Sequence, residues 1–194
     1  MFRQFIAIVV LALISYTYAQ YTSPGQCSDR TTLRPVQNFS LARYASNNTP
    51  WYPVITYSNN FDCQIVYFQL TDNVTMNMVY IQKNLTTGIW FDREAEVTWV
   101  PGNNREGVLS LVYPNVVDPL IFRILGIDYV NYTIDYRCIN LDSSSKRESL
   151  YVMSRSRSLT AAQNATVQQI LRANGLGGIR QVTVVQDATT CSQS

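Results

Sequence analysis

The chain has 194 residues, enough for one domain with a sizeable core. Its formal net charge is +2 and only 14% of its residues are charged, without the clustered Lys and Arg that binding to nucleic acid requires. The absence of histidine excludes Ser-His-Asp and Cys-His nucleophile systems and histidine-ligated zinc or haem.

Residues 1–19 have the pattern of a signal peptide. Arg3 supplies the positive start, residues 5–14 form a short apolar run, and Thr17-Tyr18-Ala19 places small residues before Gln20. The run is shorter than the roughly 20 residues that a membrane span needs, and no later run reaches that length. We therefore expect a secreted, extracellular protein without a transmembrane segment, whose single domain covers residues 20–194.

Eight strands are predicted from alternating apolar and polar residues separated by turn residues. In chain order they cover residues 51–57, 63–71, 74–82, 89–99, 106–113, 120–128, 131–138 and 148–155. Residues 158–174 instead follow helical spacing, with Thr160 as N-cap and Asn174-Gly175 as the stop. Residues 181–185 alternate again and predict a short final strand. The fold class is all-β, and the pattern is compatible with either an up-and-down barrel or a two-sheet sandwich.

The cysteines and sequons also indicate export. An even count of four cysteines in an exported chain predicts two disulfides, and three pairings are open. No Cys-x-x-Cys pair occurs, so we expect no metal site. Six Asn-x-Ser/Thr sequons predict a glycoprotein, with acceptors at Asn38, Asn47, Asn73, Asn84, Asn131 and Asn164.

Three segments resemble the motifs of lipocalins. NFSLARYASNNTPWYPVITY at residues 38–57 resembles the family's opening signature: Trp51-Tyr52 match its Gly-x-Trp-Tyr, while Thr49 replaces the glycine. GIDYVNY at residues 126–132 resembles the Thr-Asp-Tyr-x-x-Tyr motif, with Ile127 in place of threonine. YVMSR at residues 151–155 resembles the third motif. The likeness is greatest to the branch that contains apolipoprotein D, Lazarillo, insect bilin-binding protein and crustacyanin.

The resemblance implies an eight-stranded antiparallel up-and-down lipocalin barrel with one C-terminal helix and a short final strand. It also implies the disulfides Cys27–Cys138 and Cys63–Cys191. Arg155 would lie across the Trp51 ring at the closed end of the barrel, a structural role for both residues.

The apolar faces of the predicted strands give candidate ligand-binding residues, because the opposite faces are polar. The candidates are Val66, Phe68, Phe91, Arg93, Val97, Trp99, Leu109, Leu111, Tyr113, Ile134, Tyr136, Tyr151 and Met153. These side chains would either fill a solid core or line a cavity, and the resemblance favours the cavity. Arg93 would meet a ligand carboxylate, pair with a neighbouring acid, or extend to the barrel mouth.

The leading functional hypothesis is a carrier of a small hydrophobic ligand such as a fatty acid, sterol, retinoid-like or pheromone-like lipid. It needs no cofactor beyond the bound lipid. One alternative is a chromoprotein that binds biliverdin or a carotenoid, and another is an adhesive or signalling glycoprotein that acts through a cell-surface receptor. An enzyme is not expected, because a thiol-dependent isomerase would need an unpaired cysteine, and Glu94 and Glu96 lie on the solvent-facing side of their strand. The sequence makes no prediction of oligomeric state.

Overall fold

The computed structural model describes residues 20–45, 49–58 and 60–191. The predicted signal peptide and the Asn47 sequon lie outside these residues. All eight strands expected from the alternation are present within them, each shifted at its ends by a few residues.

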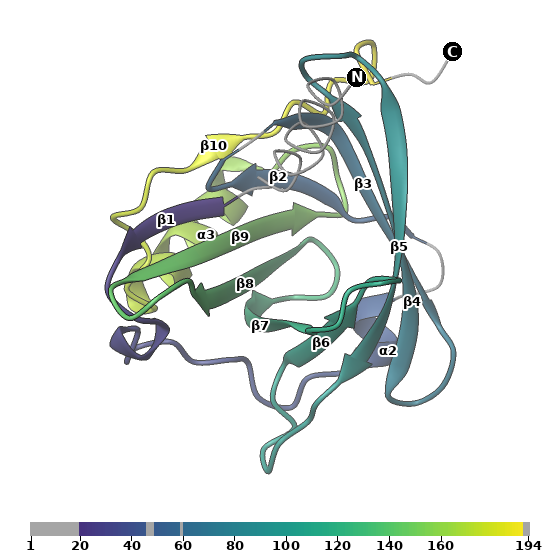
Figure 1. Ribbon diagram of the computed structural model, residues 1–194. Helices are drawn as coiled ribbons and strands as arrows, with labels where there is room; N and C mark the ends of the chain where they lie inside the picture. The colour runs from purple at the N-terminus through teal and green to yellow at the C-terminus, as the bar shows by residue number, and fades with distance from the viewer. Residues whose placement is uncertain (1–19, 46–48, 59, 192–194) are drawn as a thin grey trace, which may run out of the picture.

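The strands form one antiparallel sheet that curls on itself (Figure 1). They are Tyr52–Thr56 (β2), Phe61–Leu70 (β3), Thr75–Asn84 (β4), Trp90–Trp99 (β5), Val108–Val112 (β6), Leu120–Ile127 (β7), Tyr132–Asn140 (β8), Ser145–Ser154 (β9) and Val182–Thr183 (β10). Their order in space is β10-β2-β9-β8-β7-β6-β5-β4-β3. Neighbours in sequence are therefore neighbours in the sheet from β3 to β9, as in an up-and-down barrel.

The two ends of this sheet meet at Trp51, just before β2. Its backbone N–H donates to the Val66 carbonyl of β3 at 2.9 Å, and the Val66 N–H donates back at 2.8 Å. Further along, the Cys63 N–H donates to the Val185 carbonyl at 2.9 Å. These hydrogen bonds close the sheet into the predicted barrel, so the sandwich is wrong.

Two elements differ from the sequence prediction. Gln20–Pro24 forms an additional strand (β1), which pairs antiparallel with β9. The last strand, β10, covers only Val182–Thr183 and not residues 181–185. The sequence QYTSP of β1 has no apolar alternation, and its pairing depends on a partner more than 120 residues away.

The helix Ala161–Ala173 (α3) packs on the outside of the barrel. Its N-cap is Thr160, whose hydroxyl accepts a hydrogen bond from the Gln163 N–H. Val167 and Leu171 are fully buried in a cluster with residues of β7, β8 and β9. The molecule thus has two hydrophobic cores, one inside the barrel and one between the barrel and α3. No helix in the described ranges is long and apolar enough to cross a membrane.

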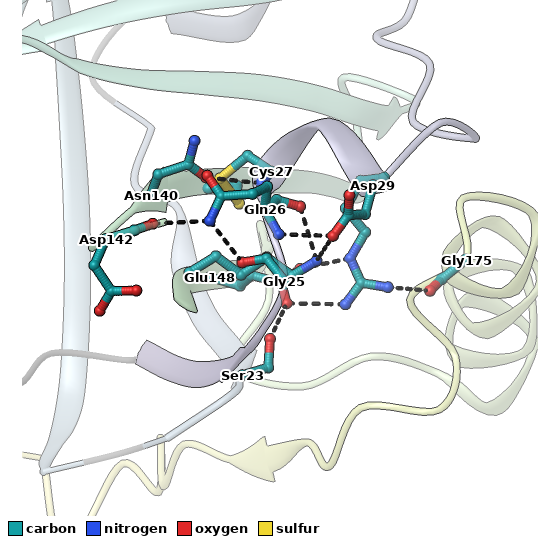
Figure 2. A network of polar contacts seen from close by, with 12 residues as sticks. Ser23, Gly25, Gln26, Cys27, Asp29, Asn140, Asp142, Glu148 and Gly175 are labelled. Atoms are coloured by element: carbon teal, nitrogen blue, oxygen red, sulfur yellow. Dashed lines mark hydrogen bonds and ion pairs between the residues drawn. A yellow bond between two sulfur atoms is a disulfide. The ribbon is translucent and has the colours of Figure 1, made fainter. Parts of the chain in front are cut away.

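Two disulfides attach the chain ends to the barrel, in the pairing that the resemblance implies. Cys27, in the 3-10 turn Cys27–Asp29 (η1), is bonded to Cys138 of β8, and Cys63 of β3 is bonded to Cys191. Beside the first disulfide, the Arg30 guanidinium donates two hydrogen bonds of 2.8 Å to Glu148 of β9. Figure 2 shows the Ser23 side chain of β1 directed at the same carboxylate. The Cys27–Cys138 disulfide and the Arg30–Glu148 contact hold the N-terminal arm, residues 20–30, against the outer face of the sheet.

Candidate ligand-binding site

One end of the barrel, which we call the closed end, is filled by packed side chains around Trp51 and Arg155. The short helix Leu41–Ala45 (α2) covers it. The Arg155 guanidinium carbon lies 3.5 Å from the centre of a Trp51 ring, and both side chains donate hydrogen bonds to the Tyr44 carbonyl. Burial lowers the pKa of Arg155 to about 10. The guanidinium is bonded to backbone carbonyls and stacked on Trp51, which is the arrangement that the resemblance implies for this pair.

An inner pocket of about 70 Å³ lies next to these residues in the barrel. Its wall is mostly apolar, and a wider space of about 550 Å³, which we call the mouth, lies beside it. Both spaces are lined by Tyr80, Tyr113, Phe122 and Tyr151, so the two adjoin at these four side chains. The mouth is within the range of about 300–1,000 Å³ that small-molecule sites occupy, whereas the inner pocket alone is narrow.

The inner pocket contains one ionisable carboxyl group, that of Asp135 on β8. It accepts hydrogen bonds from the Tyr44 hydroxyl at 2.6 Å and the Thr133 hydroxyl at 2.7 Å. Burial raises the pKa of Asp135 to about 6, although both hydrogen bonds act to lower it. The carboxyl group therefore titrates near neutral pH and is the polar feature of an otherwise apolar pocket.

Eight of the predicted ligand-binding residues lie around the inner pocket. They are Val66, Phe68, Val97, Leu109, Leu111, Tyr113, Tyr151 and Met153. They come from four strands, β3, β5, β6 and β9, and from the residue after β6, and the strand pairing places their side chains on the same face of the sheet. The alternation of those strands identified this face correctly.

Arg93, Phe91 and Trp99 share this face but lie outside the inner pocket. Arg93 lines the mouth, and Phe91 packs edge-on against Phe61 with 5.0 Å between ring centres. Trp99 belongs to the closed end, where its indole N–H donates to the Glu106 carbonyl at 2.7 Å and the ring packs on Phe39. Phe91 and Trp99 are therefore packing residues in this structure.

The prediction that Ile134 and Tyr136 face the cavity is wrong. Both are fully buried on the outer face of β8, in the cluster that contains Val167 and Leu171 of α3. The Tyr136 hydroxyl donates to Glu148, beneath the N-terminal arm. The polar face of β8 points inward instead, and it carries Asp135 and Arg137 into the cavity.

Several lining residues were not identified from the sequence. Around the inner pocket these are Tyr44, Met78, Tyr80, Phe122 and Asp135, and in the mouth they include Arg137 and Arg147. Met76, Met78 and Tyr80 alternate along β4, so strand parity could have identified that face. Tyr44 lies on α2, and no strand pattern indicates that this helix covers the closed end.

The described sequon asparagines differ in their accessibility. Asn38, Asn73 and Asn164 are exposed, whereas Asn84 and Asn131 are half-buried. The Asn84 side chain accepts hydrogen bonds from the N–H groups of Thr86 and Thr87, and the Asn131 amide donates to Asp128 at 2.8 Å. A glycan would reach the three exposed side chains most readily.

No family model and no curated protein matches the sequence. The structure is similar to insecticyanin from the tobacco hornworm Manduca sexta, with 20% identity and a TM-score of 0.72 over 90% of this chain and 94% of that one. Lobster apocrustacyanin A1 gives 22% identity and a TM-score of 0.68 over 87% and 93%. A biogenic amine-binding protein gives 14% and 0.58 over 82% and 92%. The barrel, its outer helix and the short last strand together make the chain a protein of lipocalin fold.

Proposed function

We propose that the chain is a secreted glycoprotein that binds and transports a small hydrophobic ligand in the barrel cavity. The observation that carries this proposal is an apolar inner pocket that adjoins a wide mouth and shares four wall residues with it. Apolar surface buried there by a ligand would contribute about 25 cal/mol per Å² to binding. A fatty acid, a sterol, a retinoid-like or a pheromone-like lipid has the apolar surface that such a wall favours.

The solved structures support a binding role without identifying the ligand. One of the similar proteins is described as a biogenic amine-binding protein and another as a siderocalin with dual ligand specificities. We place the chain in the branch of apolipoprotein D, Lazarillo, bilin-binding protein and crustacyanin. The likeness to insecticyanin and apocrustacyanin supports this assignment.

Export follows from the proposed signal peptide at residues 1–19, which leaves one lipocalin domain at residues 20–194. Two disulfides support an oxidising compartment. Exposed Asn38, Asn73 and Asn164 are the proposed glycan acceptors with best access, and Asn84 and Asn131 would need their hydrogen bonds rearranged.

We propose that the protein is a carrier and not an enzyme. All four cysteines are bonded in the two disulfides, so a thiol-dependent isomerase would lack its nucleophile. A chromoprotein that binds biliverdin or a carotenoid remains the alternative ligand class. Visible absorption of protein purified from its source distinguishes it, because a colourless protein carrying lipid favours the proposed carrier.

A pair of tryptophan substitutions on β6 tests the carrier proposal. Leu111 points into the inner pocket and the next residue, Val112, points outward. We expect wild-type protein to bind the neutral reporter N-phenyl-1-naphthylamine with increased fluorescence. L111W should weaken this binding about tenfold or more by filling the pocket, and V112W should leave it unchanged. Equal binding by both variants, with both melting as folded proteins, would place the reporter outside the barrel and contradict the proposal.

A further inference from the structure

Arg137 is a buried cation without an anionic partner. Its side chain is 6% exposed and lines the mouth from β8. It donates to the Ser149 hydroxyl at 3.2 Å and its guanidinium carbon lies 5.6 Å from the centre of the Phe122 ring. The Nε–H has no hydrogen-bond partner, and no carboxylate of the described chain forms an ion pair with this guanidinium. A buried charge left in this state is costly unless a ligand supplies the partner.

The mouth around Arg137 carries an excess of positive charge. Arg93 of β5 and Arg147 of β9 line the same space, and Glu94 is the one acidic side chain among the described residues that line it. Burial lowers the pKa of Arg137, and Arg147 is close enough to lower it further. Three guanidinium groups at the entrance of a low-dielectric cavity attract anions.

The apolar wall continues from Arg137 into the inner pocket. Phe122 and Tyr151 line the mouth beside the guanidinium and also line the pocket below it. A chain whose charged end meets Arg137 can therefore extend between these rings toward Leu111 and Met153. Asp135, two residues before Arg137 on the same face of β8, lies in the inner pocket and disfavours a second carboxylate there.

We propose that the cavity selects acidic amphiphiles, that is, long-chain carboxylic acids whose carboxylate accepts hydrogen bonds from Arg137 at the mouth and whose tail occupies the inner pocket. This inference rests on the proposed carrier function and assigns its ligand class. Arg93 and Arg147 contribute attraction at the entrance, and Asp135 favours the orientation with the carboxylate outward.

Titration calorimetry with dodecanoic acid, methyl dodecanoate and dodecanol, all below the concentrations at which they form micelles, tests the proposal. We expect wild-type protein to bind the acid about ten- to one-hundredfold more tightly than the ester or the alcohol, the gain typical of a hydrogen bond to a charged group. R137Q should lose this preference and bind the alcohol as wild type does. The control is R123Q on the neighbouring strand β7. Arg123 follows inward-facing Phe122 and therefore faces outward, so this variant should retain the preference for the acid.

The outcomes separate this inference from the function on which it rests. Equal affinity of wild type for the three ligands would overturn the acidic preference and leave the carrier function standing. A preference for the acid that R137Q retains would overturn the role of Arg137. If wild type binds none of the three ligands and no reporter, the carrier function itself fails. The wild-type comparison of acid with ester decides the preference even where a variant does not fold.

Discussion

Asp135 and Arg137 are the charged side chains of β8, and both point into the barrel at different depths. Asp135 is deeper and is held by the hydroxyl groups of Tyr44 and Thr133. Its pKa, raised to about 6 by burial, lies above the value of 3.8 expected in the unfolded chain. Folding therefore favours the protonated form of this carboxyl group.

This raised pKa makes the stability contribution of Asp135 depend on pH. A group with a higher pKa in the folded state stabilises fully below pH 3.8 and loses that stabilisation as the pH rises through about 6. The difference of about two pKa units corresponds to about 3 kcal/mol. We expect D135N to gain about 3 kcal/mol of unfolding free energy relative to wild type between pH 4 and pH 8.

Urea unfolding across this pH range measures the effect. E96Q, which changes an exposed carboxylate on the outer face of β5, should follow wild type at every pH. A difference between D135N and wild type that stays constant from pH 4 to pH 8 would show that Asp135 does not titrate in this window.

The N-terminal arm is attached to the sheet through Glu148 of β9. Its fully buried carboxylate accepts two hydrogen bonds of 2.8 Å from Arg30 and one of 2.5 Å from Tyr136. The Ser23 hydroxyl donates a further hydrogen bond of 3.1 Å to it (Figure 2). Although burial alone would raise it, the hydrogen bonds from Arg30 and Tyr136 lower the pKa of Glu148. The Glu148 carboxylate therefore stabilises the fold above pH 4.5, and this stabilisation is lost as the pH falls through the lowered pKa. The pH dependence is the reverse of that of Asp135.

Removing the charge of Glu148 should detach the arm. E148Q leaves Arg30 without its carboxylate and replaces two acceptor oxygens by one, which we expect to cost about 3 kcal/mol at pH 7. Amide hydrogen exchange of β1 should also accelerate, because β9 is the one strand of the described residues that pairs with β1. Unchanged exchange in β1 together with unchanged urea stability would indicate that the disulfide Cys27–Cys138 alone holds the arm.

The strands also indicate how far the sequence determines the site. In β5, Glu94 and Glu96 are exposed because no helix or strand of the described residues covers the outside of the barrel there, and alternation identifies the inner face correctly. In β8, α3 buries the outer face. Ile134 on that face therefore lies in apolar surroundings, as a residue that lines the cavity would. Alternation shows that such a strand has an apolar and a polar face. It does not show that the apolar face packs against α3, residues 161–173, and not against the interior of the barrel.

For the whole molecule, the order of strands and the disulfide pairing follow the sequence and its resemblance, whereas the shape of the cavity does not. Phe39, Tyr44, Trp51 and Trp99 fill the closed end, so ligand space is confined to the remaining part of the barrel. Rings such as Tyr80 and Phe122 pack across the barrel, and the distance between them decides whether inward side chains meet or leave a space. The spacing of residues along a strand carries no information about that distance.

The central claim, that a hydrophobic chain enters the inner pocket, is tested most directly by the position of a heavy atom at the end of that chain. We propose a crystal structure of the protein saturated with 12-bromododecan-1-ol, with anomalous diffraction recorded at the bromine edge. The account predicts a bromine peak in the inner pocket among Phe68, Leu111 and Met153. Bromine peaks only on the outer surface, or an inner pocket without bromine in a saturated crystal, would contradict it.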